Sequence, residues 1–135
     1  ALAAALEESL AESAAECERV AALRNKLRDG IVSSIDNVLV NSTEPCLHSH
    51  LHVSFPGSDG DSLIMLLDSL QIEASTGSAC SAGVNRMSHV LSAMGVTEDE
   101  GIGSLRFTLG RLTSKDDVDY LLAHLPDVVA RARTV

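Results

Sequence analysis

Cys80 lies in a segment built almost entirely of small side chains, Ser75-Thr76-Gly77-Ser78-Ala79-Cys80-Ser81-Ala82-Gly83. Buried structural cysteines usually keep large apolar neighbours, whereas the residues on either side of Cys80 are small. Two glycines and three serines predict a loop with many accessible backbone conformations, so we expect the thiol on a flexible carrier. A thiolate in such a place can act as a nucleophile.

Arg106 is the second residue whose type and position indicate chemistry. Leu105, Phe107 and Leu109 alternate with polar residues and predict a half-buried strand. Arg106 and Thr108 then project from the face opposite the core. A guanidinium held on a strand presents two parallel donors that match a carboxylate, a geometry that lysine does not reproduce.

A third group, Cys46, His48, His50 and His52, would share one face of an extended strand. Thiolate and imidazole are good zinc ligands, so a metal-binding module with an inert Cys80 loop is one alternative. The spacing is unlike the usual paired ligands, and same-face side chains on a strand diverge. A solvated edge strand with outward histidines is the more ordinary interpretation.

Three segments together resemble the C-terminal part of the cysteine desulfurases, in the class V aminotransferase family (NifS/IscS-like). They are Thr76-Gly77-Ser78-Ala79-Cys80, Ser88-His89-Val90-Leu91 and the Arg-x-Ser-x-Gly-Arg-like Arg106-Phe107-Thr108-Leu109-Gly110-Arg111. The chain departs from the family at Met87, where proline is usual, at Thr108 for serine, and at His48-Ser49, where the family has Pro-Asn.

The resemblance implies that Cys80 accepts sulfur from L-cysteine as a persulfide and that Arg106 binds the substrate's α-carboxylate. It implies pyridoxal 5'-phosphate as cofactor, a homodimeric parent, and a sulfur-acceptor protein, either a scaffold or a sulfur carrier, in iron–sulfur cluster, thio-cofactor or tRNA pathways. Arg111 is interpreted as structural, and His89 is given no role. A selenocysteine lyase-like domain sharing this fold is a further alternative.

The family's cofactor lysine has no counterpart here. The two lysines, Lys26 and Lys115, lie in charged helical stretches and not in a Ser-x-His-Lys context. The chain therefore resembles the small C-terminal domain of a fold-type I pyridoxal-phosphate enzyme, without the large lysine-bearing domain. We expect this piece alone to bind no cofactor and to turn over no cysteine.

The patterning predicts a small α+β domain, a sheet of three or four strands covered by helices. A connecting helix is expected over residues 1–29, ending at Gly30, and the α+β domain over 30–135. Strands are expected at 32–40, 51–55, 72–76 and 105–109. Helices are expected from Asp61 or Ser62 to Leu70, at 88–94, at the capping box 97–100, and from Thr113 or Ser114 onwards, where Pro126 is expected to kink or split the helix.

The bulk properties limit the function classes. The 135 residues suit one domain, and the 45% hydrophobic and 21% charged content is ordinary for a globular protein. A net charge of −9 argues against nucleic acid and anionic membranes as partners. No apolar run has the length of a membrane span, and three cysteines favour thiols in a reducing cytoplasm over disulfides.

Overall fold

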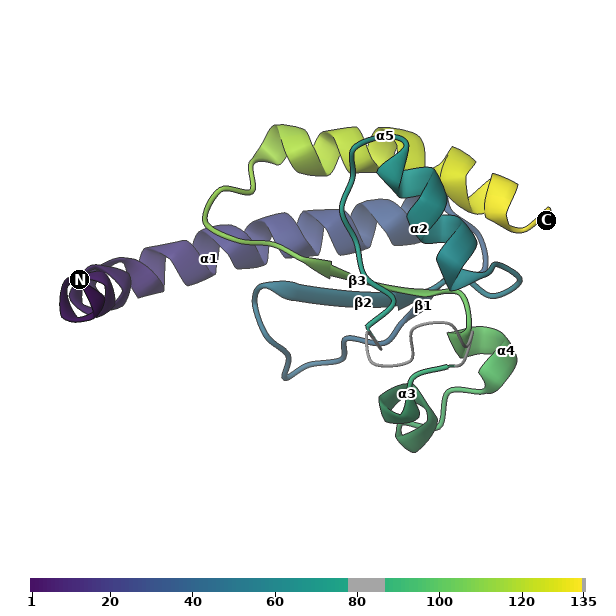
Figure 1. Ribbon diagram of the computed structural model, residues 1–135, viewed down its shortest axis with the longest axis horizontal. Coiled ribbons are helices and arrows are strands. Elements are labelled where there is room, and N and C mark those ends of the chain that lie inside the picture. Colours follow the sequence, from purple (N-terminus) through teal and green to yellow (C-terminus); the bar gives the residue numbers. More distant parts are fainter. Residues whose placement is uncertain (78–86, 135) are drawn as a thin grey trace.

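The computed structural model describes residues 1–77 and 87–134. In this part of the chain an antiparallel sheet with strand order β1-β2-β3 packs against helices (Figure 1). The strands are β1 (Leu39–Val40), β2 (His50–Ser54) and β3 (Ser104–Thr108). The helices are α1 (Leu2–Ser34), α2 (Gly60–Asp68), α3 (His89–Ala93), α4 (Glu98–Gly101) and α5 (Lys115–Ala132). The predicted α+β class with a small sheet is confirmed.

The sheet separates two groups of helices. Helices α1, α2 and α5 lie on one side of it, and the short helices α3 and α4 lie on the other (Figure 1). Strand alternation explains the division, because Leu51 and Val53 of β2 and Leu105 and Phe107 of β3 are all buried beneath the three longer helices. The same alternation turns the intervening polar residues towards α3.

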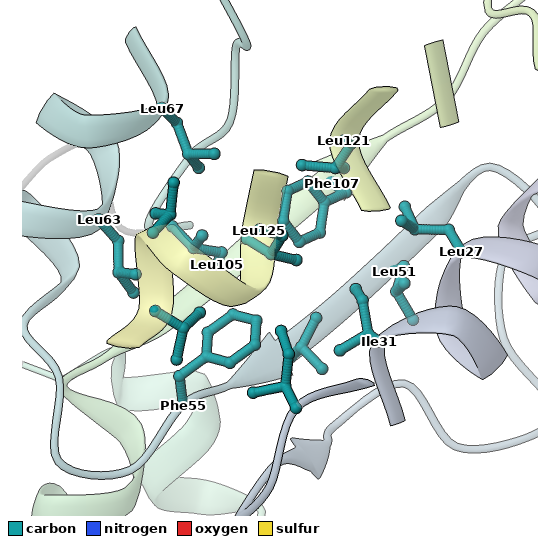
Figure 2. Close-up of a cluster of buried hydrophobic side chains, with 14 of the residues drawn as sticks. Leu27, Ile31, Leu51, Phe55, Leu63, Leu67, Leu105, Phe107, Leu121 and Leu125 are labelled. Atoms are coloured by element: carbon teal, nitrogen blue, oxygen red, sulfur yellow. The ribbon is translucent and has the colours of Figure 1, made fainter. Parts of the chain in front are cut away.

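The hydrophobic core fills the space between the sheet and α1, α2 and α5. Figure 2 shows side chains from all three helices meeting those of the strands and of Phe55: Leu27, Ile31, Leu51, Phe55, Leu63, Leu67, Leu105, Phe107, Leu121 and Leu125. Apart from the two phenylalanines, these are leucines and isoleucine, as the low aromatic content requires. Burial of each such side chain contributes about 1.5–3 kcal/mol.

Helix α1 does not stop at Gly30, so the expected end at residue 29 is wrong. Ile31 is fully buried, one turn beyond buried Leu27, and this contact with the core continues the helix to Ser34. Gly30 instead gives α1 room to approach α5, because a Cβ atom there would lie 2.6 Å from the terminal carbons of Leu122.

Two of the four expected strands lie where the sequence predicted them. β2 and β3 lie where alternation predicted them, with Leu51 opposite Phe107. The strand expected at 32–40 reduces to Leu39–Val40, because α1 takes up its first residues. The strand expected at 72–76 is wrong also, since only Ser75 forms a bridge to β3.

Helix capping largely follows the sequence. The amide of Thr97 donates to Glu100 at 3.0 Å, and Ser114 Oγ accepts from the amide of Asp117 at 3.2 Å, as expected for capping boxes. Helix α2 begins earlier than predicted, because the side chain of Asp59 accepts from the amide of Ser62. Pro126 lies inside α5 without splitting it.

The first half of α1 extends away from the core (Figure 1). Its leucines are exposed, Leu2 by 85%, Leu6 by 57% and Leu10 by 66%. None of the helices formed by residues 1–77 and 87–134 combines the length and apolar character of a bilayer-spanning helix.

Candidate functional site

A cavity of about 240 Å³ lies between the polar face of the sheet and α3. We call it the sheet pocket; its lining residues are Asn41, His52, Gly77, Ser88, Val90, Leu91, Met94 and Arg106. One wall is polar and comes from the sheet, and the facing wall is apolar and comes from α3. A cavity with convergent polar groups and an apolar wall suits a small ligand of about the size of an amino acid.

Arg106 projects from the middle of β3 into the sheet pocket, as alternation with Leu105 and Phe107 predicted. Its Nε atom is buried and has no hydrogen-bond partner in the described part of the chain. No described carboxylate forms an ion pair with its guanidinium either. An unsatisfied buried donor costs about 1–3 kcal/mol, which makes the Nε–H of Arg106 a candidate donor to a group outside the described residues.

His52 lies directly opposite Arg106 in the β2–β3 register, and both line the sheet pocket. Its ring Nδ1 is 3.1 Å from Asn41 Nδ2. Burial lowers the pKa of His52 below its ordinary value, and the positive charge of Arg106 lowers it further. The imidazole beside Arg106 is therefore neutral at neutral pH.

Cys80 lies outside the described residues, but residues on both sides of its segment line the sheet pocket. Gly77 precedes the segment, with φ of +83°, and a Cβ atom there would be 3.4 Å from His52 Nε2. Ser88 follows it as the N-cap of α3 and accepts from the amide of Val90. Met87, at the family's proline position, packs over Gly101 of α4.

The loop before β2 separates the residues of the metal-binding alternative. Cys46 Sγ accepts from Arg24 Nη1 at 2.7 Å, and Arg24 also pairs with Glu44. His48 Nε2 instead lies 3.5 Å from Cys17 Sγ of α1. Cys46 and His48 precede β2, so the expected common strand face does not exist for them.

Of the remaining two histidines, His50 contacts Ser49 Oγ through Nδ1 at 3.0 Å, and His52 lines the sheet pocket. Within residues 1–77 and 87–134, no three His, Cys, Asp or Glu side chains are placed to hold a metal ion. The described residues do not support the metal-binding alternative.

Neither lysine is placed to hold an aldehyde cofactor at the sheet pocket. Lys26 of α1 and Lys115 of α5 both pair with the carboxylate of Asp119, on the helical side of the sheet. The residues described here therefore do not fit the lysine role that pyridoxal-phosphate chemistry needs.

Sequence reasoning placed Arg106 correctly and missed His52 and Asn41 as pocket residues. Alternation did put His52 on the polar side of its strand, but the register that sets it opposite Arg106 is a tertiary property. A signal was present, since His52 and Arg106 each lie between two apolar residues of a strand.

Comparison with known proteins agrees with the sequence motifs. Residues 1–121 match the family model described as Aminotransferase class-V. The chain is 47% identical over 117 residues to an IscS-like cysteine desulfurase from Mycobacterium tuberculosis, which covers 85% of this chain and 30% of the relative. It is 38% identical over 120 residues to cysteine desulfurase IscS 1 from Archaeoglobus fulgidus, covering 89% and 31%.

Solved structures show the same fold. A NifS-like protein superposes with a TM-score of 0.80 at 28% identity, over 96% of this chain and 32% of the other. A NifS-like protein from Rickettsia africae gives a TM-score of 0.76 at 21% identity, over 88% and 30%. The chain thus spans about a third of these proteins. The resemblance to cysteine desulfurases is confirmed.

Proposed function

The chain belongs to the aminotransferase class-V family, and on that premise we propose that it is the C-terminal domain of a cysteine desulfurase. In this proposal Cys80 accepts sulfur and Arg106 binds the carboxylate of the substrate. The observation that carries it is that Arg106 lines a pocket bounded by residues from both sides of the Cys80 segment, while its buried Nε has no hydrogen-bond partner among the described residues. The relatives named cysteine desulfurase support the choice of reaction.

The reaction transfers one sulfur atom. L-Cysteine and the Cys80 thiol become alanine and a Cys80 persulfide, so the C–S bond of the substrate breaks as an S–S bond forms. Pyridoxal 5'-phosphate would supply the electron sink for this chemistry, and a lysine outside the 135 residues would hold it. The isolated 135-residue chain is accordingly expected to be inactive and to bind no cofactor.

Arg106 orients the substrate. A two-pronged guanidinium–carboxylate contact fixes both the position and the plane of the amino acid's carboxylate. Val90, Leu91 and Met94 supply apolar groups on the other side of the pocket, where Leu91 is buried and Val90 and Met94 are each 53% exposed. This combination holds a small amino acid with its side chain free to meet a thiol.

The persulfide then passes to a sulfur-acceptor protein. The small-residue segment around Cys80 suits a thiol that must serve both a pocket and an external partner. The proposal includes a homodimeric parent in the cytoplasm. Its sulfur would serve iron–sulfur clusters, thio-cofactors or tRNA.

The test uses the full-length protein that contains this chain, with alanine and sulfide formation from L-cysteine as readouts. Cys80→Ala is expected to abolish sulfide formation, whereas Cys46→Ala and Cys17→Ala serve as matched controls with thiols outside the sheet pocket. Arg106→Leu is expected to raise KM for L-cysteine at least about tenfold, because a hydrogen bond between two charged groups is lost. Full activity in Cys80→Ala would contradict the proposal.

A further inference from the structure

Asn41 fixes which nitrogen of His52 carries the proton. The amide Nδ2 of Asn41 is 3.1 Å from His52 Nδ1 and 2.8 Å from Ser54 Oγ. An amide nitrogen has two N–H groups, one for each of these acceptors. Nδ1 of His52 therefore accepts a hydrogen bond, and in the neutral ring the proton resides on Nε2.

His52 and Gly77 both line the sheet pocket, and the Nε2 edge of the His52 ring is next to Gly77. A Cβ atom on Gly77 would lie 3.4 Å from Nε2. In the described part of the chain no group forms a hydrogen bond with Nε2. Arg106 lies opposite His52 in the register and lines the same cavity, and its buried Nε has no hydrogen-bond partner among the described residues. Two adjacent strands therefore place an imidazole and a guanidinium at one cavity.

We propose that His52 is a second ligand for the substrate carboxylate, with its neutral imidazole donating the Nε2 proton to the anion that Arg106 binds. This inference rests on the proposed function and names a binding residue beyond Arg106. A carboxylate has about four lone-pair sites, of which a guanidinium uses two, so one further donor is readily accommodated.

The charge of the pair selects the kind of anion. Neutral His52 and cationic Arg106 together carry one positive charge, which balances a carboxylate rather than a phosphate dianion. A protonated His52 would repel Arg106 and would turn an N–H towards the Asn41 amide that now donates to it. Asn41 thus acts as a positioning residue that holds His52 in its donating form.

Kinetics of the full-length protein test the role of His52. His52→Leu is expected to raise KM for L-cysteine about tenfold or more, with a smaller change in kcat, because a binding contact is lost. His52→Gln places an amide N–H near the former Nε2 and is expected to restore most of the affinity. His50→Leu, on the same strand but outside the sheet pocket, is the matched control and should leave KM unchanged.

A binding measurement separates this inference from the proposed function. Full-length protein labelled with ¹⁵N-histidine is titrated with L-alanine, which has the carboxylate but no sulfur to transfer. We expect the His52 Nε2 resonance to shift and its pKa to rise, and the His50 resonances to stay in place. A shift without desulfurase activity keeps the inference and refutes the function. The inference alone is overturned if the protein is active but the His52 resonance does not shift. It is also overturned if the folded His52→Leu variant is active with an unchanged KM.

Discussion

Ser75 and Arg106 exchange two backbone hydrogen bonds, with the amide of Arg106 2.6 Å from the Ser75 carbonyl and the amide of Ser75 3.2 Å from the Arg106 carbonyl. Ser75 is the point from which the chain departs towards Cys80, five residues later. Five extended residues span at most about 18 Å, so the proposed sulfur-accepting thiol is within this chain length of the bridge to Arg106. The short bridge at Ser75 thus ties the two proposed functional residues together.

Gly77 is expected to tolerate no side chain. Its φ of +83° is strained for alanine by about 1–2 kcal/mol, and the added methyl group would lie against the Nε2 edge of His52. Gly77→Ala should therefore lower the free energy of unfolding and raise KM in the full-length protein. Gly95→Ala is the control, because Gly95 has φ of +85° and open space around it. If both variants show the same KM, Gly77 does not shape the pocket.

Arg106 is expected to stabilise ligand binding at the expense of folding. Its buried Nε has no described partner, so Arg106→Met should not lower the free energy of unfolding in chemical denaturation. Arg24→Met is the contrasting variant. Arg24 is only 5% exposed and bonds to Glu44 and Cys46, and its loss should destabilise the fold by at least about 1 kcal/mol. Equal destabilisation by both changes would contradict the view of Arg106 as an unpaired group.

His52 should make stability depend on pH. Burial and Arg106 lower the pKa of His52 in the folded protein, so the unfolded chain binds more protons below the ordinary histidine pKa of about 6.5. The stability of the fold with neutral His52 is fully present above about pH 6.5 and declines as pH falls below it. Chemical denaturation across this range should show a weaker decline in His52→Gln. Parallel pH curves for the two proteins would contradict this prediction.

Gly30 should not behave as an ordinary helix glycine. Replacing a helix-interior glycine by alanine usually adds about 1 kcal/mol of stability. In α1 the new methyl group would contact Leu122 of α5 at 2.6 Å, which should cancel that gain. The gain should reappear when Gly30→Ala is made in a Leu122→Ala background, measured by a double-mutant cycle. Identical effects in both backgrounds would contradict the close packing of α1 and α5.

The local sequence pattern was sufficient to predict the strands with alternating apolar residues and the helices with capping side chains. The strands containing Leu51 and Phe107 and the helix capped by Ser114 follow from side-chain period and hydrogen-bonding capacity. The end of α1 could not be predicted from the local sequence, because a glycine at position 30 is typical of the residue that follows a helix. Its contact with Leu122 depends on a helix more than eighty residues later.

The residues of the candidate site also divide into one predicted from local sequence and others that depend on tertiary structure. Arg106 was found from its strand position and motif, whereas His52 required the register between strands and the Asn41 amide. The four-residue metal hypothesis failed because it assumed that residues 46–52 form one strand. Only 50–52 of these belong to β2, and Cys46 bonds to Arg24 instead.

The most direct test of the account is to map sulfur on the full-length protein after exposure to L-cysteine. Alkylation followed by peptide mass spectrometry should find one extra sulfur atom on Cys80 and none on Cys17 or Cys46. The same label should be greatly reduced in Arg106→Leu at low substrate concentration. An unmodified Cys80 in protein that releases alanine and sulfide from L-cysteine would contradict the account.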